Sequence, residues 1–311
     1  MNTIKLAILA VWLPLALTLS AAAQDSSSLP YNQARDVVYG EVHGTGLLMD
    51  VFSPKGKTNG LAIIDVVSGA YSSDRGKIRD HTLAQLYNIF CTHGYTVFGI
   101  RPGSRSRYTA SEMDAHVKIG IRYVKEHAGE YKIDPERLGI TGASAGGHLA
   151  TLAAVTPEEG KPDARQPGQR LSTKVMAAAV FFPPTDFLDW NGAPANVGLL
   201  GDLFFLGGAK GRSDEEIKER ASQLSPARRV KDKPVPFLLI HGDADLVVPL
   251  QQSQVMLAAL KAAGGSAELI VKKGGAHPWM TLPEEVKIMA NWFDQQLLEN
   301  KAAEPATPAA Q

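Results

Sequence analysis

The sequence contains a single cysteine, Cys91, among 311 residues. One cysteine excludes an internal disulfide, and the apolar residues around it predict a buried, inert thiol within a helix. An excess of charge of either sign is also missing, since 32 Lys and Arg side chains balance 32 Asp and Glu side chains. A net charge of zero gives no electrostatic reason to expect nucleic acid or an anionic membrane surface as a partner.

The apolar run at 6–19 is too short to span a bilayer comfortably, which takes about 20 residues. It follows a single basic residue, Lys5, and leads into three alanines at 21–23. This arrangement is typical of a secretory signal peptide with small residues at its cleavage site. We therefore expect a signal peptide over 1–23, cut before Gln24, and a secreted or periplasmic protein with no membrane span after cleavage.

The eight histidines include no pair with metal-ligand spacing on a helix, so we expect no metal and no cofactor. There is no internal repeat, and the mature length suits one large domain with its own core. We expect a flexible leader over 24–34, a single domain over 35–298, and a disordered tail over 299–311 that is mostly Ala and Pro.

Strand-type and helix-type segments alternate along this domain, which is the pattern of a mostly parallel sheet flanked by helices. Strands are expected at 47–52, 61–67, 95–100, 136–141, 175–182, 236–240 and 267–272. Helices are expected at 80–93, 111–127, 146–155, 214–223, 250–263 and 283–298.

The most informative motif is Gly-Ala-Ser-Ala-Gly at 142–146, which joins the strand at 136–141 to the small-residue helix at 146–155. A serine at the apex of such a turn has a strained backbone, and the glycines on either side let strand and helix pass closely. The strain lifts the hydroxyl clear of the backbone and points the free N–H groups of the helix start at the reacting centre. The motif therefore predicts Ser144 as a nucleophile and the N–H of Ala145 as an oxyanion donor.

A serine hydroxyl is a weak nucleophile and needs a base and a group that orients the base. Asp245 lies in His-Gly-Asp-Ala-Asp-Leu-Val-Val-Pro at 241–249, and His277 lies in Gly-Gly-Ala-His at 274–277. Each loop follows a predicted strand, and in open parallel sheets the active site gathers at the carboxyl ends of the strands. The order Ser, Asp, His along the chain is the one used by α/β-hydrolases.

These motifs, together with the segments 37–40 and 48–54, resemble the α/β-hydrolase superfamily over roughly residues 35–298. The resemblance is to the esterase branch that includes acetyl esterases, carbohydrate (acetyl-xylan and feruloyl) esterases and relatives of prolyl oligopeptidase. It implies an α/β-hydrolase fold with a mostly parallel eight-stranded sheet flanked by helices. It also implies Ser144 as the nucleophile, Asp245 as the orienting acid and His277 as the base.

The chain departs from this branch after its third expected strand, where Ser-Gly-Ala-Tyr at 68–71 replaces a His-Gly-Gly-Gly type loop. Any non-proline residue carries a backbone N–H, so Ala70 and Tyr71 are expected oxyanion donors beside Ala145. The conformation of this loop stays open, because glycine tolerates backbone angles that Ala and Tyr avoid. His116 is a second departure, at a position where relatives more often carry an aspartate.

Several assignments have alternatives. Asp186 and Asp243 compete with Asp245 for the role of the acid. His148 and His241 are expected to pack or to satisfy backbone groups rather than to act as the base. The remaining histidines are expected at surface or satisfied core positions; they are His43, His81, His93, His116 and His127.

Two segments allow two readings each. Arg101, Arg105 and Arg107 belong either to a solvated loop or to a contact with an anionic or sugar part of the substrate. The segment 187–225 is either a lid over the acyl pocket or a crossover that packs on the sheet.

The sequence thus predicts a serine hydrolase that cleaves carboxylic esters through an acyl-enzyme. The expected substrate is a small-molecule or carbohydrate ester with a short acyl group, and the oligomeric state stays open. The alternatives are a serine peptidase of the prolyl oligopeptidase type and a non-catalytic binding protein, which the altered loop at 68–71 keeps open. Fold and triad specify acyl transfer, and neither the acyl group nor the alcohol follows from them.

Overall fold

The computed structural model describes residues 28–195 and 197–299. The expected signal peptide lies outside the described residues, as does the expected tail apart from Glu299, and both stay predictions. The leader expected over 24–34 is wrong at its end, because the first strand begins at Tyr31. Tyr31 is buried and its ring packs edge-on against Phe52 at a centroid distance of 5.3 Å, which holds the start of this strand on the core.

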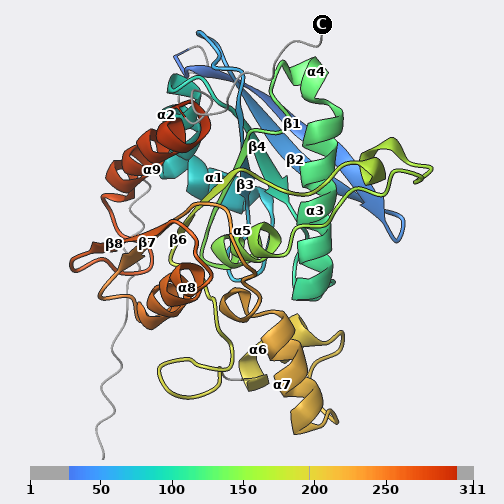
Figure 1. The fold of residues 1–311 in the computed structure, drawn as a ribbon, viewed down its shortest axis with the longest axis vertical. Coiled ribbons are helices and arrows are strands. Elements are labelled where there is room, and N and C mark those ends of the chain that lie inside the picture. Colours follow the sequence, from blue (N-terminus) through green and yellow to red (C-terminus); the bar gives the residue numbers. More distant parts are fainter. Residues whose placement is uncertain (1–27, 196, 300–311) are drawn as a thin grey trace, which may run out of the picture.

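Eight strands form one sheet in the order β1-β2-β4-β3-β5-β6-β7-β8 (Figure 1). Their bounds are β1 (Tyr31–Val42), β2 (Thr45–Pro54), β3 (Ala62–Val66), β4 (Thr96–Arg101), β5 (Leu138–Ala143), β6 (Ala177–Phe181), β7 (Phe237–Gly242) and β8 (Ala267–Lys272). β2 runs antiparallel to β1 and β4 on either side of it, and β4, β3, β5, β6, β7 and β8 are mutually parallel. The predicted mostly parallel, eight-stranded sheet is confirmed.

Nine α-helices lie among the described residues. Their bounds are α1 (Arg75–Leu83), α2 (Leu86–Thr92), α3 (Ala110–Glu126), α4 (Ala128–Tyr131), α5 (Ala145–Val155), α6 (Val197–Phe204), α7 (Asp214–Gln223), α8 (Gln251–Ala262) and α9 (Leu282–Leu297). Short 3₁₀ helices occupy Pro167–Arg170 and Pro226–Arg228. None of the described helices is long and apolar enough to cross a bilayer.

The helices form two layers, each with its own apolar core against the sheet. In Figure 1, α1, α2 and α9 gather on one face, while α3, α5 and α8 lie on the other. Every residue of α5 is buried, because this helix of Ala, Gly and Leu packs centrally against the sheet and its neighbours. Cys91 lies in α2 and is buried, as predicted, and burial raises the pKa of its thiol to about 12.

The helix expected over 80–93 is two helices, because Gln85 between them has a left-handed backbone with φ of 61°. The first of them begins earlier than expected, at Arg75, where the Asp74 side chain accepts a hydrogen bond from the N–H of Lys77. The helix α6 was not expected, since two glycines interrupt its apolar pattern. In Figure 1, α6 and α7 lie below the lower edge of the sheet.

Candidate active site

The turn between β5 and α5 carries Ser144 with φ of 54° and ψ of −120°, a conformation that L-residues rarely adopt. The glycines around it are required by close backbone contacts. A Cβ on Gly142 would lie 2.5 Å from the backbone of Gly146, and a Cβ on Gly146 would lie 2.1 Å from the carbonyl oxygen of Val66. Strand, turn and helix are thus packed too closely for any side chain at these two positions.

Ser144, His277 and Asp245 form a continuous hydrogen-bonded chain. Ser144 Oγ lies 2.8 Å from His277 Nε2, and His277 Nδ1 lies 2.6 Å from Asp245 Oδ2. The three residues come from the loops after β5, β8 and β7, so the carboxyl edge of the sheet brings them together. Phe182 packs against the imidazole of His277 at a centroid distance of 4.4 Å and limits the positions that this ring can take.

Asp245 is buried, and its carboxylate is well supplied with hydrogen-bond donors. Oδ1 accepts from the N–H groups of Val247 at 2.8 Å and Val248 at 2.9 Å, while Oδ2 faces His277 and, at 3.5 Å, His241. Burial by itself raises the pKa of Asp245, but the hydrogen bonds from His241, His277 and the two backbone N–H groups hold it well below its usual range. The carboxylate therefore stays ionised opposite His277.

The two competing carboxylates have other partners. Asp186 Oδ1 accepts from the N–H of Leu188 at 2.9 Å and from Arg228 Nε at 2.8 Å. Asp243 Oδ1 accepts from the N–H of Gly274 at 2.6 Å, which ties the β7 loop to the β8 loop. Of the three candidate acids, the geometry pairs only Asp245 with His277.

The other histidines near the site are held away from the serine. His241 contacts Ser253 Oγ at 2.7 Å and the carbonyl oxygen of Val248 at 2.9 Å. His148 Nε2 lies 2.7 Å from the carbonyl oxygen of Leu224. Burial lowers the pKa of His148 to about 4, so this imidazole is neutral. His116, the second departure from the family pattern, contacts the carbonyl oxygen of Pro102 at 2.7 Å.

The loop at 68–71 has backbone angles that glycine tolerates and that Ala and Tyr usually avoid. Ala70 and Tyr71 have φ of 48° and 60°, both in the left-handed region that favours glycine. Paired backbone hydrogen bonds between Gly69 and Ser72, of 3.0 and 2.9 Å, hold this turn. The N–H groups of Ala70, Tyr71 and Ala145 have no acceptor within the described residues, and all three residues line the cavity at Ser144.

Tyr71 is anchored from its side chain as well. The ring packs edge-on against His148 at 5.6 Å, and its hydroxyl is buried without a hydrogen-bond partner among the described residues. Burial raises the pKa of this hydroxyl well above its usual range, so it remains protonated.

A cavity of about 1010 Å³ opens around Ser144 and His277. Apolar residues that follow β6 line it on one side, namely Phe187, Trp190 and Leu200, so the first part of the segment 187–225 borders the cavity. The role of this segment as a lid stays a prediction. The other side lies toward α1, α2 and α9 and contains the polar side chains of α1; these are Lys77, Asp80 and His81.

Of the three arginines at the end of β4 and in the loop after it, one lines the cavity. Arg105 lines it and lies 3.8 Å from Asp202. Arg101, the last residue of β4, instead forms an ion pair with Asp36, and the Arg107 guanidinium lies 5.9 Å from the centre of the Tyr108 ring. The three therefore do not act as one cluster.

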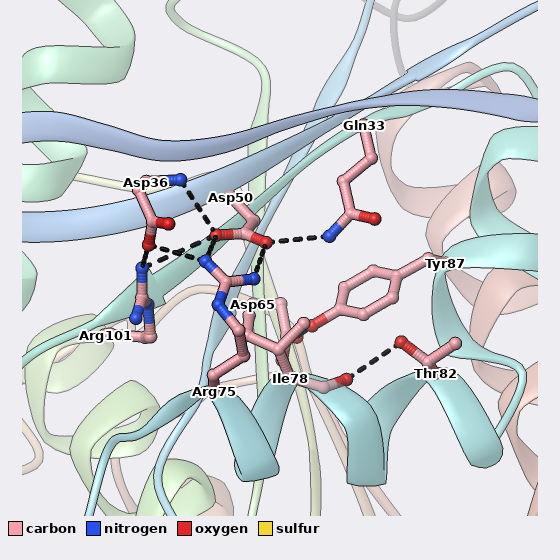
Figure 2. Close-up of polar contacts among 9 residues, drawn as sticks. All are labelled: Gln33, Asp36, Asp50, Asp65, Arg75, Ile78, Thr82, Tyr87 and Arg101. Atoms are coloured by element: carbon pink, nitrogen blue, oxygen red, sulfur yellow. Dashed lines mark hydrogen bonds and ion pairs between the residues drawn. The ribbon is translucent and has the colours of Figure 1, made fainter.

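The network of ion pairs and hydrogen bonds that holds the start of α1 was not predicted from the sequence. Arg75, in the first turn of this helix, reaches the buried carboxylate of Asp50, with distances of 2.9 and 3.3 Å (Figure 2). Gln33 donates to the same carboxylate at 2.7 Å, and Arg101 and Asp36 complete the network. A buried aspartate costs free energy unless it is paired, so this network fixes the start of α1 on the sheet.

Within the described part of the chain, no group of three or more His, Cys, Asp or Glu side chains has a geometry that would hold a metal ion.

Comparisons with known proteins agree with this architecture. The BD-FAE family matches residues 49–260. The chain is 28% identical over 237 residues to the probable carboxylic ester hydrolase LipM of Mycobacterium tuberculosis, covering 74% of this chain and 52% of that protein. It is 27% identical over 260 residues to the esterase LipQ of the same organism, covering 82% and 59%. The chain therefore spans only about half to three-fifths of these relatives.

A solved structure, described as a truncated form of a carbohydrate esterase from gut microbiota, is 26% identical to this chain. It superposes with a TM-score of 0.74 and covers 87% of this chain and 98% of that one.

Proposed function

The chain belongs to the BD-FAE family and has the α/β-hydrolase fold, and on this basis we propose that it is a serine esterase whose nucleophile is Ser144. One observation carries the proposal. Ser144 Oγ, the His277 imidazole and the Asp245 carboxylate are joined by hydrogen bonds of 2.8 and 2.6 Å at the carboxyl edge of the sheet. The relatives named as esterases support the same activity.

In the proposed mechanism His277 Nε2 takes the proton of Ser144 as its oxygen attacks the ester carbonyl. The proton then passes from His277 to the leaving alcohol, and an acyl group remains on Ser144. A water molecule, activated by the same imidazole, attacks the acyl-enzyme and releases the carboxylic acid. Asp245 keeps the Nδ1 proton of His277 in place and stabilises the imidazolium that forms in each half of the reaction.

The negative charge on the carbonyl oxygen needs donors that are in place before the reaction. The N–H of Ala145, at the start of α5, is the first donor that we propose, and the helix dipole adds to it. Ala70 and Tyr71 are the candidates for the second, because their N–H groups are unoccupied and their strained backbone is held by the Gly69–Ser72 pair. The Gly69–Ser72 hydrogen bonds thus hold Ala70 and Tyr71 in a backbone conformation that glycine adopts more readily.

For the substrate we propose a short acyl group on a carbohydrate or other small alcohol. The cavity supports this, because apolar residues such as Phe187 and the polar side chains of α1 both line it around the serine. The structural relative named as a carbohydrate esterase points to the same class.

A fluorophosphonate probe tests the nucleophile directly, because it reacts with an activated serine and leaves an inert one unmodified. We expect labelling of Ser144 in the unsubstituted protein and none in the Ser144→Ala variant. Hydrolysis of 4-nitrophenyl acetate should fall at least about 10³-fold in the same variant, since one triad member is lost. Turnover above a tenth of the original value, with the variant folded, would reject Ser144 as the nucleophile.

A further inference from the structure

A second histidine–aspartate pair borders the cavity. Asp65 is fully buried in β3, where its Oδ2 accepts a hydrogen bond from the Tyr87 hydroxyl at 3.0 Å. His81 Nδ1 lies 2.8 Å from the same oxygen and 3.0 Å from Oδ1. The pair joins α1 to the middle of the sheet, and Tyr87 comes from α2; Figure 2 shows the hydroxyl end of Tyr87 pointing toward Asp65.

His81 reaches this aspartate from the cavity side. Its side chain is 12% exposed and lines the cavity, whereas Asp65 has no exposure at all. Since Nδ1 is occupied by Asp65, the outer edge of the ring carries Nε2. This atom has no hydrogen-bond partner among the described residues, and it is not one of the fully buried unpartnered atoms. In His81, Nδ1 is therefore held by Asp65, while Nε2 is free to bind a group in the cavity.

The charges around His81 favour its protonated form. Burial by itself lowers the pKa of His81, but the carboxylates of Asp65 and Asp80 outweigh burial, and its pKa lies above the usual value in spite of Lys77. In that form Nε2 donates a hydrogen bond. Lys77 and Asp80, paired at 2.8 Å on the same turn of α1, add further donors and an acceptor to this wall.

We propose that His81 is a specificity-determining residue, whose Nε2–H binds a hydroxyl group on the alcohol part of the ester. The proposal rests on the esterase function proposed above. A hydroxyl-bearing alcohol needs both donors and acceptors, which the α1 wall provides. Among Phe187, Trp190 and Leu200 on the opposite wall, the indole N–H of Trp190 is the one side-chain donor and there is no side-chain acceptor, so this wall suits the acyl group instead.

The chain contains a matched control for this pair. His93 Nδ1 lies 2.7 Å from Asp294, and the Tyr95 hydroxyl donates to the same carboxylate at 2.8 Å. This is the same His–Asp–Tyr arrangement, but none of its members lines the cavity. A substitution of His93 thus removes the same kind of contact without touching the proposed substrate site.

The test compares His81→Asn, His81→Gln and His93→Asn on two acetates. The asparagine amide can replace Nδ1 and keep Asp65 paired, while only glutamine can extend a donor toward the position of Nε2. One substrate is acetylated xylose, whose alcohol has hydroxyl groups, and the other is 4-nitrophenyl acetate, whose alcohol has none. Thermal unfolding of each variant establishes that it is folded.

We expect His81→Asn to raise KM for acetylated xylose about 10- to 100-fold, the value of a hydrogen bond to a charged donor. Its kcat, and both constants for 4-nitrophenyl acetate, should stay within about threefold because the triad is untouched. His81→Gln should recover part of the loss, and His93→Asn should have no effect on either KM. In the unsubstituted protein KM for the sugar ester should rise at alkaline pH as His81 loses its proton, and this rise should vanish in His81→Asn.

An equal change of KM for both esters, or no change for acetylated xylose, overturns the proposal. The same is true if His93→Asn reproduces the effect of His81→Asn. A protein that hydrolyses 4-nitrophenyl acetate but not acetylated xylose refutes the role of His81 and leaves the esterase function standing. A protein that hydrolyses neither ester and fails to react with fluorophosphonate refutes the proposed function itself.

Discussion

Asp245 differs from Asp186 and Asp243 by its partners rather than by its chemistry. All three are aspartates near the same edge of the sheet, but only Asp245 contacts His277 while two backbone N–H groups hold its other oxygen. This arrangement fixes the carboxylate before the reaction begins. It also fixes which nitrogen of His277 carries a proton, and therefore which one faces Ser144.

We expect Asp245→Asn to lower kcat by up to about 10⁴-fold, because an amide at this position can stabilise the wrong tautomer of His277. Asp186→Asn and Asp243→Asn are the controls and should stay within a few-fold, provided that they fold. Steady-state hydrolysis of 4-nitrophenyl acetate by the three purified variants is the measurement. A larger loss in Asp186→Asn than in Asp245→Asn would move the acid to the loop after β6.

His148 predicts how the stability of the protein depends on pH. Its pKa is about 4 in the folded protein, below the usual 6.5, so between these values only the unfolded chain binds the proton. Stability due to this group is therefore fully present above pH 6.5 and falls as the pH decreases toward 4. Between pH 7 and pH 4.5 we expect a loss of about 2 kcal/mol in the free energy of unfolding.

Urea unfolding at several pH values measures this loss, and His148→Gln provides the comparison. Glutamine retains an N–H donor for the carbonyl oxygen of Leu224 but does not titrate. The slope of stability against pH should be smaller in the variant by up to one proton. Equal slopes in the two proteins would assign the acid sensitivity to other groups.

The sequence indicated the triad because each member lies in a local motif at a strand end. It did not indicate the pair of Asp65 and His81, which are 16 residues apart and meet only when α1 folds over β3. One signal was present in the strand expected at 61–67, where Asp65 is the only charged residue among apolar ones. A charge in a buried strand demands a partner, but the sequence does not say which residue provides it.

At the scale of elements, the turn from β5 to α5 depends on contacts that allow no side chain. Gly146→Ala places a Cβ 2.1 Å from the carbonyl oxygen of Val66, which is backbone in the middle of the sheet and has little room to move. We expect a loss of stability of about 2–3 kcal/mol or a failure to fold, together with loss of activity as Ser144 shifts. Gly129→Ala in α4, where a Cβ would meet nothing within 4 Å, is the matched control.

Thermal unfolding measures the stability of the Gly146→Ala and Gly129→Ala variants. Fluorophosphonate labelling measures whether Ser144 keeps its reactive geometry in each. A Gly146→Ala protein as stable and as reactive as Gly129→Ala would show that the turn can relax without loss.

The elements were predictable where the local pattern and the final packing agree, as they do for β5, α5 and α7. They were not predictable where tertiary contacts determine where an element begins or ends. Gln85 divides α1 from α2 with a backbone that no local sequence signal announces. The strand β1 starts at Tyr31 because that ring finds Phe52 on the neighbouring strand.

At the scale of the whole molecule, the cavity lies where the two layers of helices meet the carboxyl edge of the sheet. Phe187 belongs to the apolar core on the α5 face, whereas Leu86 and Val286 belong to the core on the α9 face. Ser144 lies between them, at the end of a central strand. Each layer thus contributes one wall, and the polar side chains of α1 lie on the α9 side together with Leu86 and Val286, whereas Phe187 lies on the α5 side.

This division predicts that acyl length and alcohol preference are controlled by different walls. Trp190 stacks on Phe187 with ring planes 4° apart and a centroid distance of 6.3 Å, so Trp190→Ala should enlarge the apolar side alone. We expect the ratio of kcat/KM for 4-nitrophenyl hexanoate to that for the acetate to rise about tenfold, since each added methylene in an apolar pocket is worth about 1–3 kcal/mol. His81→Asn should leave this ratio unchanged. If Trp190→Ala instead alters the preference among alcohols and keeps the acyl ratio, then the two walls have the opposite roles.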